Sequence, residues 1–246
     1  MRLDQLTVIV PTRNEAKNIR GFLRSLPDQV ALIVVDASED NTPELVNKYR
    51  PNRTSVLRHP GRISEARFYG AQMAQSPWLL FTDADIVFGP DYFERSQHYP
   101  HCDVIYGPKL SQGEFIHYYR WFARGQQLSQ WLGVPAASGS NLLISRQSLF
   151  RSGGFDLQLT CNEDSELVWR VKRAGFSVRF APDLIVYEQD HRRLRLGRTR
   201  KTIHSLTRCL LLYLDLIPNR WRSRDWGYWS HQSKNGDSQS KAFTKG

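Results

Sequence analysis

Short apolar segments alternate with longer amphipathic ones in the first half of the chain, and this alternation predicts strands and helices in succession. Runs such as LIVV and WLLF are apolar throughout, which is typical of strands that helices cover on both faces. Strand and helix in turn predict a parallel sheet with crossover helices. The predicted strands are residues 6–10, 31–35, 78–82, 103–106, 141–144 and 184–187, and the predicted early helices are residues 15–26, 42–50 and 63–74.

Polar residues follow the first predicted strand directly. Asn14 can cap the helix that starts after it, which places Thr12 and Arg13 at the carboxyl end of the strand. Open α/β sheets bind their ligands at this edge. We therefore expect an α/β fold with a mostly parallel central sheet flanked by helices, and a ligand site where the strands end.

The pattern changes in the second half. Residues 115–132 have aromatic side chains at helical spacing, which predicts a helix packed in the core rather than a ligand platform. Residues 162–174 predict another helix, with acidic residues in its first turn. A basic and then leucine-rich stretch at 195–217 predicts a C-terminal amphipathic helical extension, and the polar residues 231–246 predict a disordered tail.

The net charge of +10 lies entirely at the C-terminal end. Residues 1–190 contain 21 basic and 21 acidic side chains, whereas residues 191–246 contain 13 and 3. A neutral body with a basic appendage is typical of an enzyme-like domain that seeks an anionic partner. Arginines beside leucines and tryptophans suit peripheral contact with an anionic membrane. The alternative is that the leucines pack against the domain while the arginines face water.

Motifs that the chain lacks indicate which partners and which compartment to expect. The chain has no helix-turn-helix, zinc-finger or ribonucleoprotein motif, so we expect no nucleic-acid partner. The three cysteines, Cys102, Cys161 and Cys209, are far apart and form no C-x-x-C pair, which favours a reducing compartment. No secretory signal or membrane-spanning segment is predicted. We expect a cytoplasmic location, with peripheral attachment to the inner face of the membrane left open.

Two carboxylates, Asp83 and Asp85, follow an apolar strand and are separated by Ala84. Both can reach one cleft, where they would repel each other unless a cation lay close by. Hard divalent ions such as Mg²⁺ and Mn²⁺ prefer carboxylate and diphosphate oxygens. Because D-x-D also occurs by chance in loops, it indicates a metal site only together with the segments around it.

Five segments follow one another in a specific order, and together they carry a resemblance. They are VIVPTRNEAKNI, VVDASEDNT, PGRISEARFYGAQMAQSPWLLFTDAD, ASGSNLLISRQSLFRSGGFD and CNEDSELVWRVKRAGF. In this order the chain resembles the family-2 glycosyltransferases, which have the glycosyltransferase A fold, over about residues 6–190. The resemblance implies that a sugar moves from a nucleotide-diphosphate donor to an acceptor hydroxyl with inversion. It also implies a catalytic domain at 1–190, with a donor half to about 110 and an acceptor half after it, and a basic extension at 191–230.

The same resemblance implies which residues bind the donor. Those matching nucleotide-sugar positions are Pro11, Thr12, Glu15, Asp36, Arg67, Asp83 and Ala84. Family members often have a second acid after Asp36, whereas Ala37 stands here, so the base is open. A divalent metal, Mn²⁺ or Mg²⁺, is implied at Asp85 and Asp83, with His191 as a further ligand. Asp190 is the rival to His191, and Arg192 and Arg193 offer charges that neutralise the diphosphate instead.

On the acceptor side the resemblance implies a general base, Asp164, which would take the proton from the acceptor hydroxyl. The simpler interpretation of Asp164 is an acid that complements a helix dipole, and both can hold. The residues matching the acceptor and donor-sugar side are Gly139, Ser140, Asn141 and Glu163.

Three alternatives to glycosyl transfer onto an acceptor hydroxyl are considered for this sequence. A polyprenyl-phosphate sugar synthase shares the domain but acts on a lipid phosphate at the membrane surface, so the acceptor is either a carbohydrate or lipid-linked. A non-catalytic nucleotide-sugar-binding module is disfavoured because Asp83, Asp85 and Asp164 are all intact. A nucleotidyltransferase is disfavoured because PTRNEAKN replaces its glycine-rich basic loop.

Overall fold

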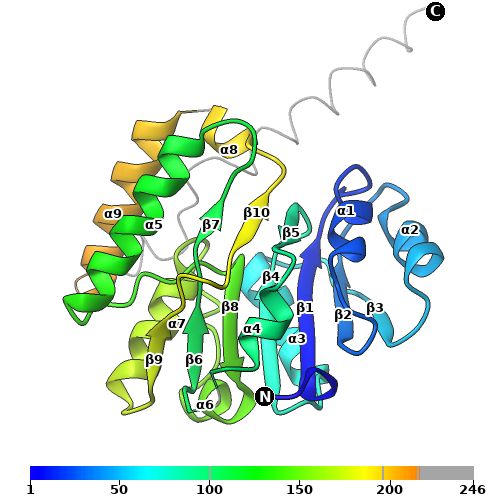
Figure 1. Ribbon diagram of the computed structural model, residues 1–246, viewed down its shortest axis with the longest axis horizontal. Coiled ribbons are helices and arrows are strands. Elements are labelled where there is room, and N and C mark those ends of the chain that lie inside the picture. The colour runs from blue at the N-terminus through cyan, green and yellow to red at the C-terminus, as the bar shows by residue number, and fades with distance from the viewer. Residues whose placement is uncertain (100, 196, 215, 217–246) are drawn as a thin grey trace, which may run out of the picture.

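Two sheets and the helices around them make up the described part of the chain (Figure 1). The computed structural model describes residues 1–99, 101–195, 197–214 and 216. The large sheet contains β1 (Leu6–Thr12), β2 (Ala31–Asp36), β3 (Thr54–Arg58), β4 (Trp78–Thr82), β6 (Val104–Tyr106), β8 (Asn141–Ser145) and β9 (Val178–Phe180). Their order is β3-β2-β1-β4-β8-β6-β9, and only the pairs formed by β8 are antiparallel. The predicted mostly parallel sheet is confirmed.

A small second sheet continues beyond the carboxyl ends of β4 and β6. It contains β5 (Ile86–Phe88), β7 (Lys109–Leu110) and β10 (Val186–Glu188), in the order β5-β10-β7. Strand β10 is antiparallel to β5 and parallel to β7. Because β5 and β7 follow β4 and β6 after very short connections, this sheet lies next to the carboxyl edge of the large one (Figure 1).

Helices cover both faces of the large sheet. One core cluster contains residues of α1 (Ile19–Arg24), α2 (Thr42–Tyr49) and α4 (Tyr92–Ser96), and the other contains residues of α3 (Ile63–Met73), α6 (Arg146–Arg151) and α7 (Glu163–Arg173). Along β1 the side chains alternate between these clusters, so Val8 and Val10 join the first while Ile9 joins the second. Both faces of β1 are therefore covered by a buried core cluster.

The first helix begins later than predicted, and the prediction that Asn14 caps it is wrong. Asn14 has a left-handed backbone (φ 57°), and its side-chain oxygen accepts a hydrogen bond from the Glu39 amide at 2.9 Å. Its own amide donates to Ser38 Oγ at 2.9 Å. Asn14 therefore joins the loop after β1 to the loop after β2, and α1 starts only at Ile19.

The prediction that residues 115–132 form a core helix is half right. The helix forms as α5 (Ile116–Trp131), but only Tyr119 and Gln126 are buried along it. Trp131 is 77% exposed. The prediction missed this because aromatic spacing shows a helical face but not what covers that face.

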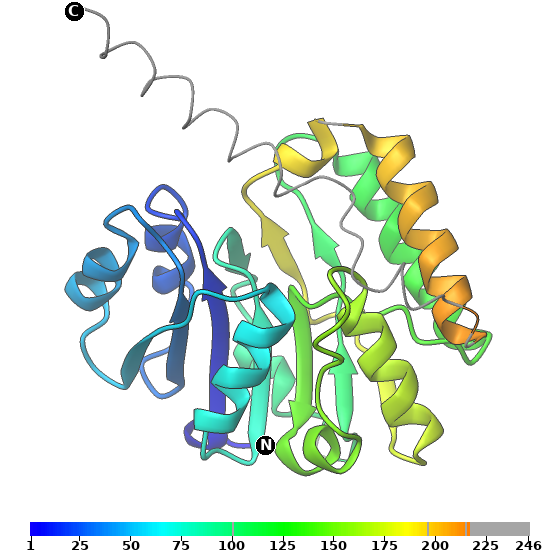
Figure 2. The ribbon, with the colours of Figure 1, turned by 180° about the vertical axis from the view of Figure 1, so that it is seen from behind.

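The C-terminal helices are α8 (Arg192–Arg195) and α9 (Arg198–Tyr213), and α9 lies beside α5 in both views (Figures 1 and 2). In α9, Leu206 and Leu210 are exposed and Arg208 is buried, whereas Leu212 is buried against Leu159. The alternative of packed leucines and hydrated arginines therefore holds at Leu212 and fails at the other three positions. No helix in the described ranges is both long and apolar enough to span a bilayer. The predicted tail at 231–246 lies outside the described residues.

Candidate active site

The start of β8 brings distant polar residues to the end of β4. In the antiparallel pairing Thr82 lies opposite Asn141, so the residues just before β8 meet the residues just after β4. Thr82 Oγ1 donates to the Ser140 carbonyl at 3.0 Å, and Ser140 Oγ donates to Asp83 Oδ2 at 2.5 Å. Two predicted segments that are 57 residues apart thus form one site.

Arg67 on α3 joins this site to the start of α7. Its guanidinium donates from Nη2 to Asp83 Oδ1 at 2.8 Å and from Nη1 to Glu163 Oε1 at 2.6 Å. Arg67 is only 2% exposed. Burial alone would lower its pKa, but the charges of Asp83, Glu163 and Asp164 outweigh burial and raise the pKa of Arg67. Its positive charge is therefore fixed among three carboxyl groups.

Gly139 leaves room for the Arg67 guanidinium because it has no side chain. A Cβ added there would lie 2.2 Å from Arg67 Nη1. The Gly139 amide donates to Asp164 Oδ2 at 2.5 Å, and the Ser165 amide donates to Asp164 Oδ1 at 2.7 Å. The backbone thus holds both oxygens of Asp164 in place beside Arg67.

Glu163 is buried and shares the pocket with Asp164. Burial raises the pKa of Glu163 to about 7, with a further contribution from the negative charge of Asp164, and Arg67 opposes the rise. Because its pKa is raised, Glu163 holds its proton at a higher pH than an ordinary glutamate does.

Lys109 begins β7, and its ammonium is buried near the two carboxylates that follow β4. Its Nζ forms an ion pair with Glu188 on β10 and lies 3.4 Å from Ser140 Oγ. Burial alone would lower the pKa of Lys109, but the charges of Glu188, Asp85 and Asp83 together raise it. The site therefore contains a permanent cation of its own beside Asp85.

His191 lies in a pocket of hydroxyl and aromatic groups. Its Nε2 is 3.2 Å from Ser111 Oγ and its Nδ1 is 3.3 Å from Tyr119 Oη. The rings of Phe115 and Tyr119 both lie 5.7 Å from its ring centre. Among the described residues, no three His, Cys, Asp or Glu side chains converge as a metal site. The structure therefore does not bring His191 together with Asp83 and Asp85 as a ligand set.

The predicted nucleotide residues on β1 and β2 lie side by side. The strand register pairs Thr12 with Asp36, and Thr12 Oγ1 donates to Asp36 Oδ1 at 2.7 Å. Ser38 Oγ and Arg58 Nη1 also donate to the Asp36 carboxylate, at 2.6 and 2.8 Å. The buried carboxylate thus organises the loop after β2.

Glu15 connects the loop after β1 to the C-terminal part of the chain. It accepts from Arg192 Nη2 at 3.0 Å and from Asn18 Nδ2 at 2.6 Å. Arg192 also pairs with Asp190. Of the other predicted residues, Pro11 is the second-last residue of β1, directly before Thr12. Ala84 is buried in the core.

The Asn141 side chain lies inside the fold. Tyr92 Oη donates to its oxygen at 2.6 Å, and its amide nitrogen donates to the Leu184 carbonyl at 2.8 Å. Asn141 therefore fixes the base of the site from within the core rather than pointing into the site.

Sequence reasoning missed Lys109, Glu188 and Arg58 at this site. Lys109 and Glu188 sit on strands of two and three residues, which are too short to show a periodic pattern. Arg58 reaches Asp36 through the β2–β3 register. A basic residue directly after G-P in YGPKL was the only local signal for Lys109.

Solved structures with the same fold bind nucleotide-sugars. The chain superposes on a mannosyltransferase from Pyrobaculum calidifontis, solved with GDP-Man and Mn²⁺, with a TM-score of 0.67 and 20% identity over 89% of this chain and 72% of the other. It also superposes on residues 1–349 of S. aureus TarS with UDP-GlcNAc, with a TM-score of 0.59 and 19% identity over 76% and 58%. These likenesses confirm the predicted glycosyltransferase A fold.

Sequence comparison identifies the family. The "Probable glycosyltransferase YdaM" of Bacillus subtilis (strain 168) is 27% identical over 217 residues, covering 76% of this chain and 51% of the relative. The chain thus spans about half the length of the curated relatives it matches. The profile described as "Glycosyl transferase family 2" matches residues 7–150. The chain belongs to glycosyl transferase family 2.

Proposed function

We propose that this chain transfers a sugar from a nucleotide-diphosphate donor to an acceptor hydroxyl, with inversion at the anomeric carbon. The observation that carries the proposal is the buried guanidinium of Arg67, which binds Asp83 and Glu163 and lies beside Asp164. A nucleotide-sugar donor is supported by the GDP-Man and UDP-GlcNAc found in the structural neighbours. It is also supported by family membership.

The donor half of the site would bind the nucleoside beyond β1 and β2. Pro11, Thr12, Glu15 and the loop that Asp36 organises line this edge. The Glu15–Arg192 ion pair would flank the diphosphate, because it joins the loop after β1 to α8. Arg192 supplies charge there without leaving the surface, since its side chain is 42% exposed.

Asp83 and Asp85 fit a divalent cation by their chemistry. They supply hard carboxylate oxygens, and Mg²⁺ is commonly bound by one or two carboxylates together with substrate phosphates. A pair of protein ligands is therefore enough, and His191 is not needed. A Mn²⁺ or Mg²⁺ ion held there would supply positive charge to the diphosphate leaving group. Lys109 adds a second, permanent positive charge on the same side.

Asp164 is the general base in this proposal. Backbone amides from Gly139 and Ser165 hold its two oxygens, yet a carboxylate has about four lone-pair positions, so capacity remains for an acceptor hydroxyl. Asp164 takes the hydroxyl proton as that oxygen forms its bond to the anomeric carbon. The bond from that carbon to the diphosphate breaks, and the nucleoside diphosphate leaves with the electron pair. Arg67 stabilises the arrangement by holding Asp83 and Glu163 in place.

Replacing Asp164 by Asn tests the proposal. We expect kcat to fall by about 10²–10⁴-fold, the range for a positioned general base, while donor affinity changes little. Glu166→Gln is the matched control, because Glu166 lies in the same turn but pairs with Arg170 at 2.8 Å. Full transfer by Asp164→Asn would rule out the assignment of the base. Absence of sustained nucleoside diphosphate release by the unmodified protein would favour the non-catalytic binding module.

The acceptor is proposed as a carbohydrate or a lipid-linked molecule. Exposed apolar side chains on α5 and α9 favour the second, which keeps a polyprenyl-phosphate sugar synthase as the other candidate. Partition of radiolabelled product into an organic phase separates the two. We propose a cytoplasmic location, with peripheral contact at the inner face of the membrane, supported by three cysteines that lie far apart in the sequence and form no C-x-x-C pair.

A further inference from the structure

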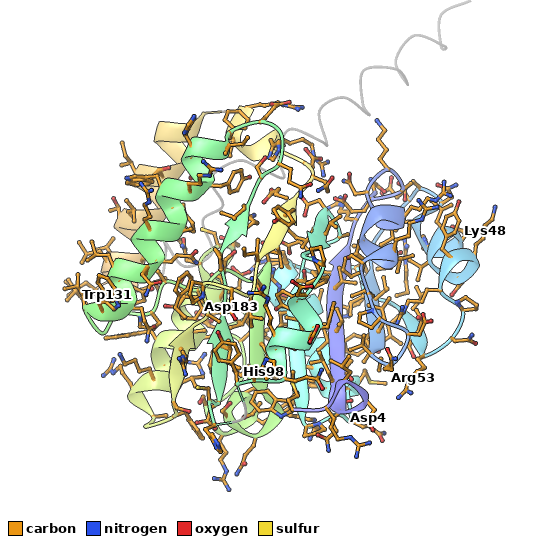
Figure 3. The ribbon with its side chains drawn as sticks, viewed as in Figure 1. Asp4, Lys48, Arg53, His98, Trp131 and Asp183 are labelled. Atoms are coloured by element: carbon orange, nitrogen blue, oxygen red, sulfur yellow. The ribbon has the colours of Figure 1, made fainter. Side chains whose placement is uncertain are left out.

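The exposed large apolar side chains of the described chain are concentrated on one pair of helices. Twelve are exposed in the described ranges, and nine of these belong to α5, α9 or the residues that directly follow them. The nine are Trp121, Leu128, Trp131, Leu132, Ile203, Leu206, Leu210, Leu214 and Leu216. Both views show α5 and α9 side by side, and Trp131 projects away from the body of the molecule (Figures 2 and 3). A concentration of this kind marks an interaction surface.

Helix α9 has its more polar face inward and its apolar face outward. The inward positions contact α5, the segment after it, or α7 and the residues just before α7. They are Thr202, Ser205, Arg208, Cys209, Leu212 and Tyr213, of which only Leu212 is aliphatic. The outward positions are Ile203, Leu206, Leu210 and Leu214. A helix at a water-facing surface normally shows the opposite arrangement. The outward stripe therefore fits a helix whose outer face is covered in the working protein.

The charge of the segment that contains α9 indicates which partner covers the outer face of this helix. Residues 192–214 contain seven Lys and Arg side chains and no acidic one. A second copy docked by the same face would bring two such segments together, which like charges oppose. Residues 217–246 contain six basic and two acidic side chains, so their charge has the same sign. An anionic lipid surface complements the charge and also takes up the apolar stripe.

The inner face of α9 reaches the proposed general base. The Asn162 side chain donates to Ser205 Oγ at 3.0 Å and to Cys209 Sγ at 3.1 Å, and Asn162 directly precedes Glu163 and Asp164. Burial, together with the nearby charge of Asp164, raises the pKa of the Cys209 thiol to about 11. A surface bound to the outside of α9 would thus lie one helix away from the acceptor site.

We propose that the outer faces of α9 and α5 dock the protein peripherally on an anionic lipid bilayer. The leucines and tryptophans enter the interface, and the net positive charge of residues 192–214 attracts the anionic headgroups. If the proposed transferase activity holds, this docking presents a lipid-linked acceptor to Asp164. The presentation of an acceptor to Asp164 rests on the proposed function, whereas the docking itself does not.

Vesicle binding of the full chain tests the docking. We expect the protein to sediment with vesicles of 70% phosphatidylcholine and 30% phosphatidylglycerol at 50 mM NaCl, and at least tenfold less with pure phosphatidylcholine or at 500 mM NaCl. Leu206→Glu/Leu210→Glu should weaken binding to the anionic vesicles by about tenfold or more, because it places charge in the apolar stripe. The control Met73→Glu/Leu157→Glu, at two exposed apolar positions outside the helix pair, should bind like the unmodified protein.

Three results would overturn the proposal. The unmodified protein could fail to bind anionic vesicles at low salt, or Leu206→Glu/Leu210→Glu could bind as well as the control. Light scattering could also show a dimer that this variant dissociates, which would assign the surface to a second copy. Thermal unfolding checks that both variants fold, and nucleotide-sugar binding is measured separately. Vesicle binding without sugar transfer would therefore contradict the proposed function and leave the docking intact.

Discussion

Arg67 favours the charged form of the buried Glu163 carboxyl, because its guanidinium lies 2.6 Å from Glu163 Oε1. A buried guanidinium with three acidic neighbours stays charged, and it cannot be removed without leaving buried acids unpaired. Even so, it only partly offsets the burial of Glu163, whose pKa remains raised to about 7. At Glu163, burial and the charge of Asp164 together therefore outweigh the attraction of Arg67.

This balance predicts a pH dependence of stability. Between the ordinary pKa of 4.5 and the raised pKa near 7, the folded state binds more protons at Glu163 than the unfolded state, so the free energy of unfolding falls as pH rises. Urea unfolding should show that Glu163→Gln removes about 2–3 kcal/mol of the decrease between pH 5 and pH 7.5. The variant is less stable overall, because Arg67 loses a partner, but the slope is the readout. Glu44→Gln, an exposed position on α2, should keep the slope of the unmodified protein, and an equal slope in Glu163→Gln would contradict the assignment.

At the scale of elements, two very short strands hold the cation beside Asp85. The register of β7 with β10 places Lys109 near Glu188, and the Lys109 side chain is 15% exposed and that of Glu188 6%. Such a pair stabilises little as a whole, yet removing one partner leaves the other as an uncompensated buried charge. The small sheet is therefore sensitive to either single substitution.

Lys109→Met should lower the free energy of unfolding by about 3–5 kcal/mol. Lys109→Met/Glu188→Met should lose less than the two single variants combined, with a coupling of more than about 1 kcal/mol in a double-mutant cycle. The exposed pair Arg95–Asp91 on α4 provides the comparison, and Arg95→Met should cost less than about 1 kcal/mol. Additive losses for Lys109 and Glu188 would show that the buried pair does not act as a unit.

Elements with a long apolar run were predictable from the sequence, and those defined by tertiary pairing were not. The bounds of β4 agree with the prediction of residues 78–82, because five apolar or β-branched residues end at two aspartates. Strands β5, β7 and β9 have two or three residues each, too few to show any period. The loop geometry of Asn14 depends on contacts with the loop after β2, which no local pattern reveals.

In the site, too, residues within sequence motifs were predictable, whereas residues placed by tertiary pairing were not. The acidic segments at Asp83 and Asp164 were identified from motif order, and the structure brings both to Arg67. Lys109 was not identified, because it reaches the site only through the β7–β10 pairing. Sequence also gave no sign that His191 lies between two hydroxyl groups.

At the scale of the whole molecule, a single site draws on nearly the full described length of the chain. Thr12 and Asp36 lie on the proposed donor side, Asp83 and Lys109 in the middle, and Asp164 on the proposed acceptor side. A ligand that contacts all of these segments would bind the folded state and not the unfolded one. Donor binding should therefore be visible as global stabilisation.

Thermal unfolding with nucleotide-sugars tests this expectation. A GDP- or UDP-linked sugar at a hundredfold excess over its dissociation constant adds about 2.7 kcal/mol, or roughly 5–10 °C for a chain of this size. We expect the full shift to require Mn²⁺ or Mg²⁺, because Asp83 and Asp85 would hold an ion that neutralises the diphosphate. Asp85→Asn should lose the metal-dependent part of the shift, whereas Asp91→Asn, at an exposed carboxylate on the surface, should retain it. A shift that EDTA leaves unchanged would assign charge neutralisation to Lys109 and Arg192 in place of a metal, and the proposed role of Asp83 and Asp85 as ligands would then fail.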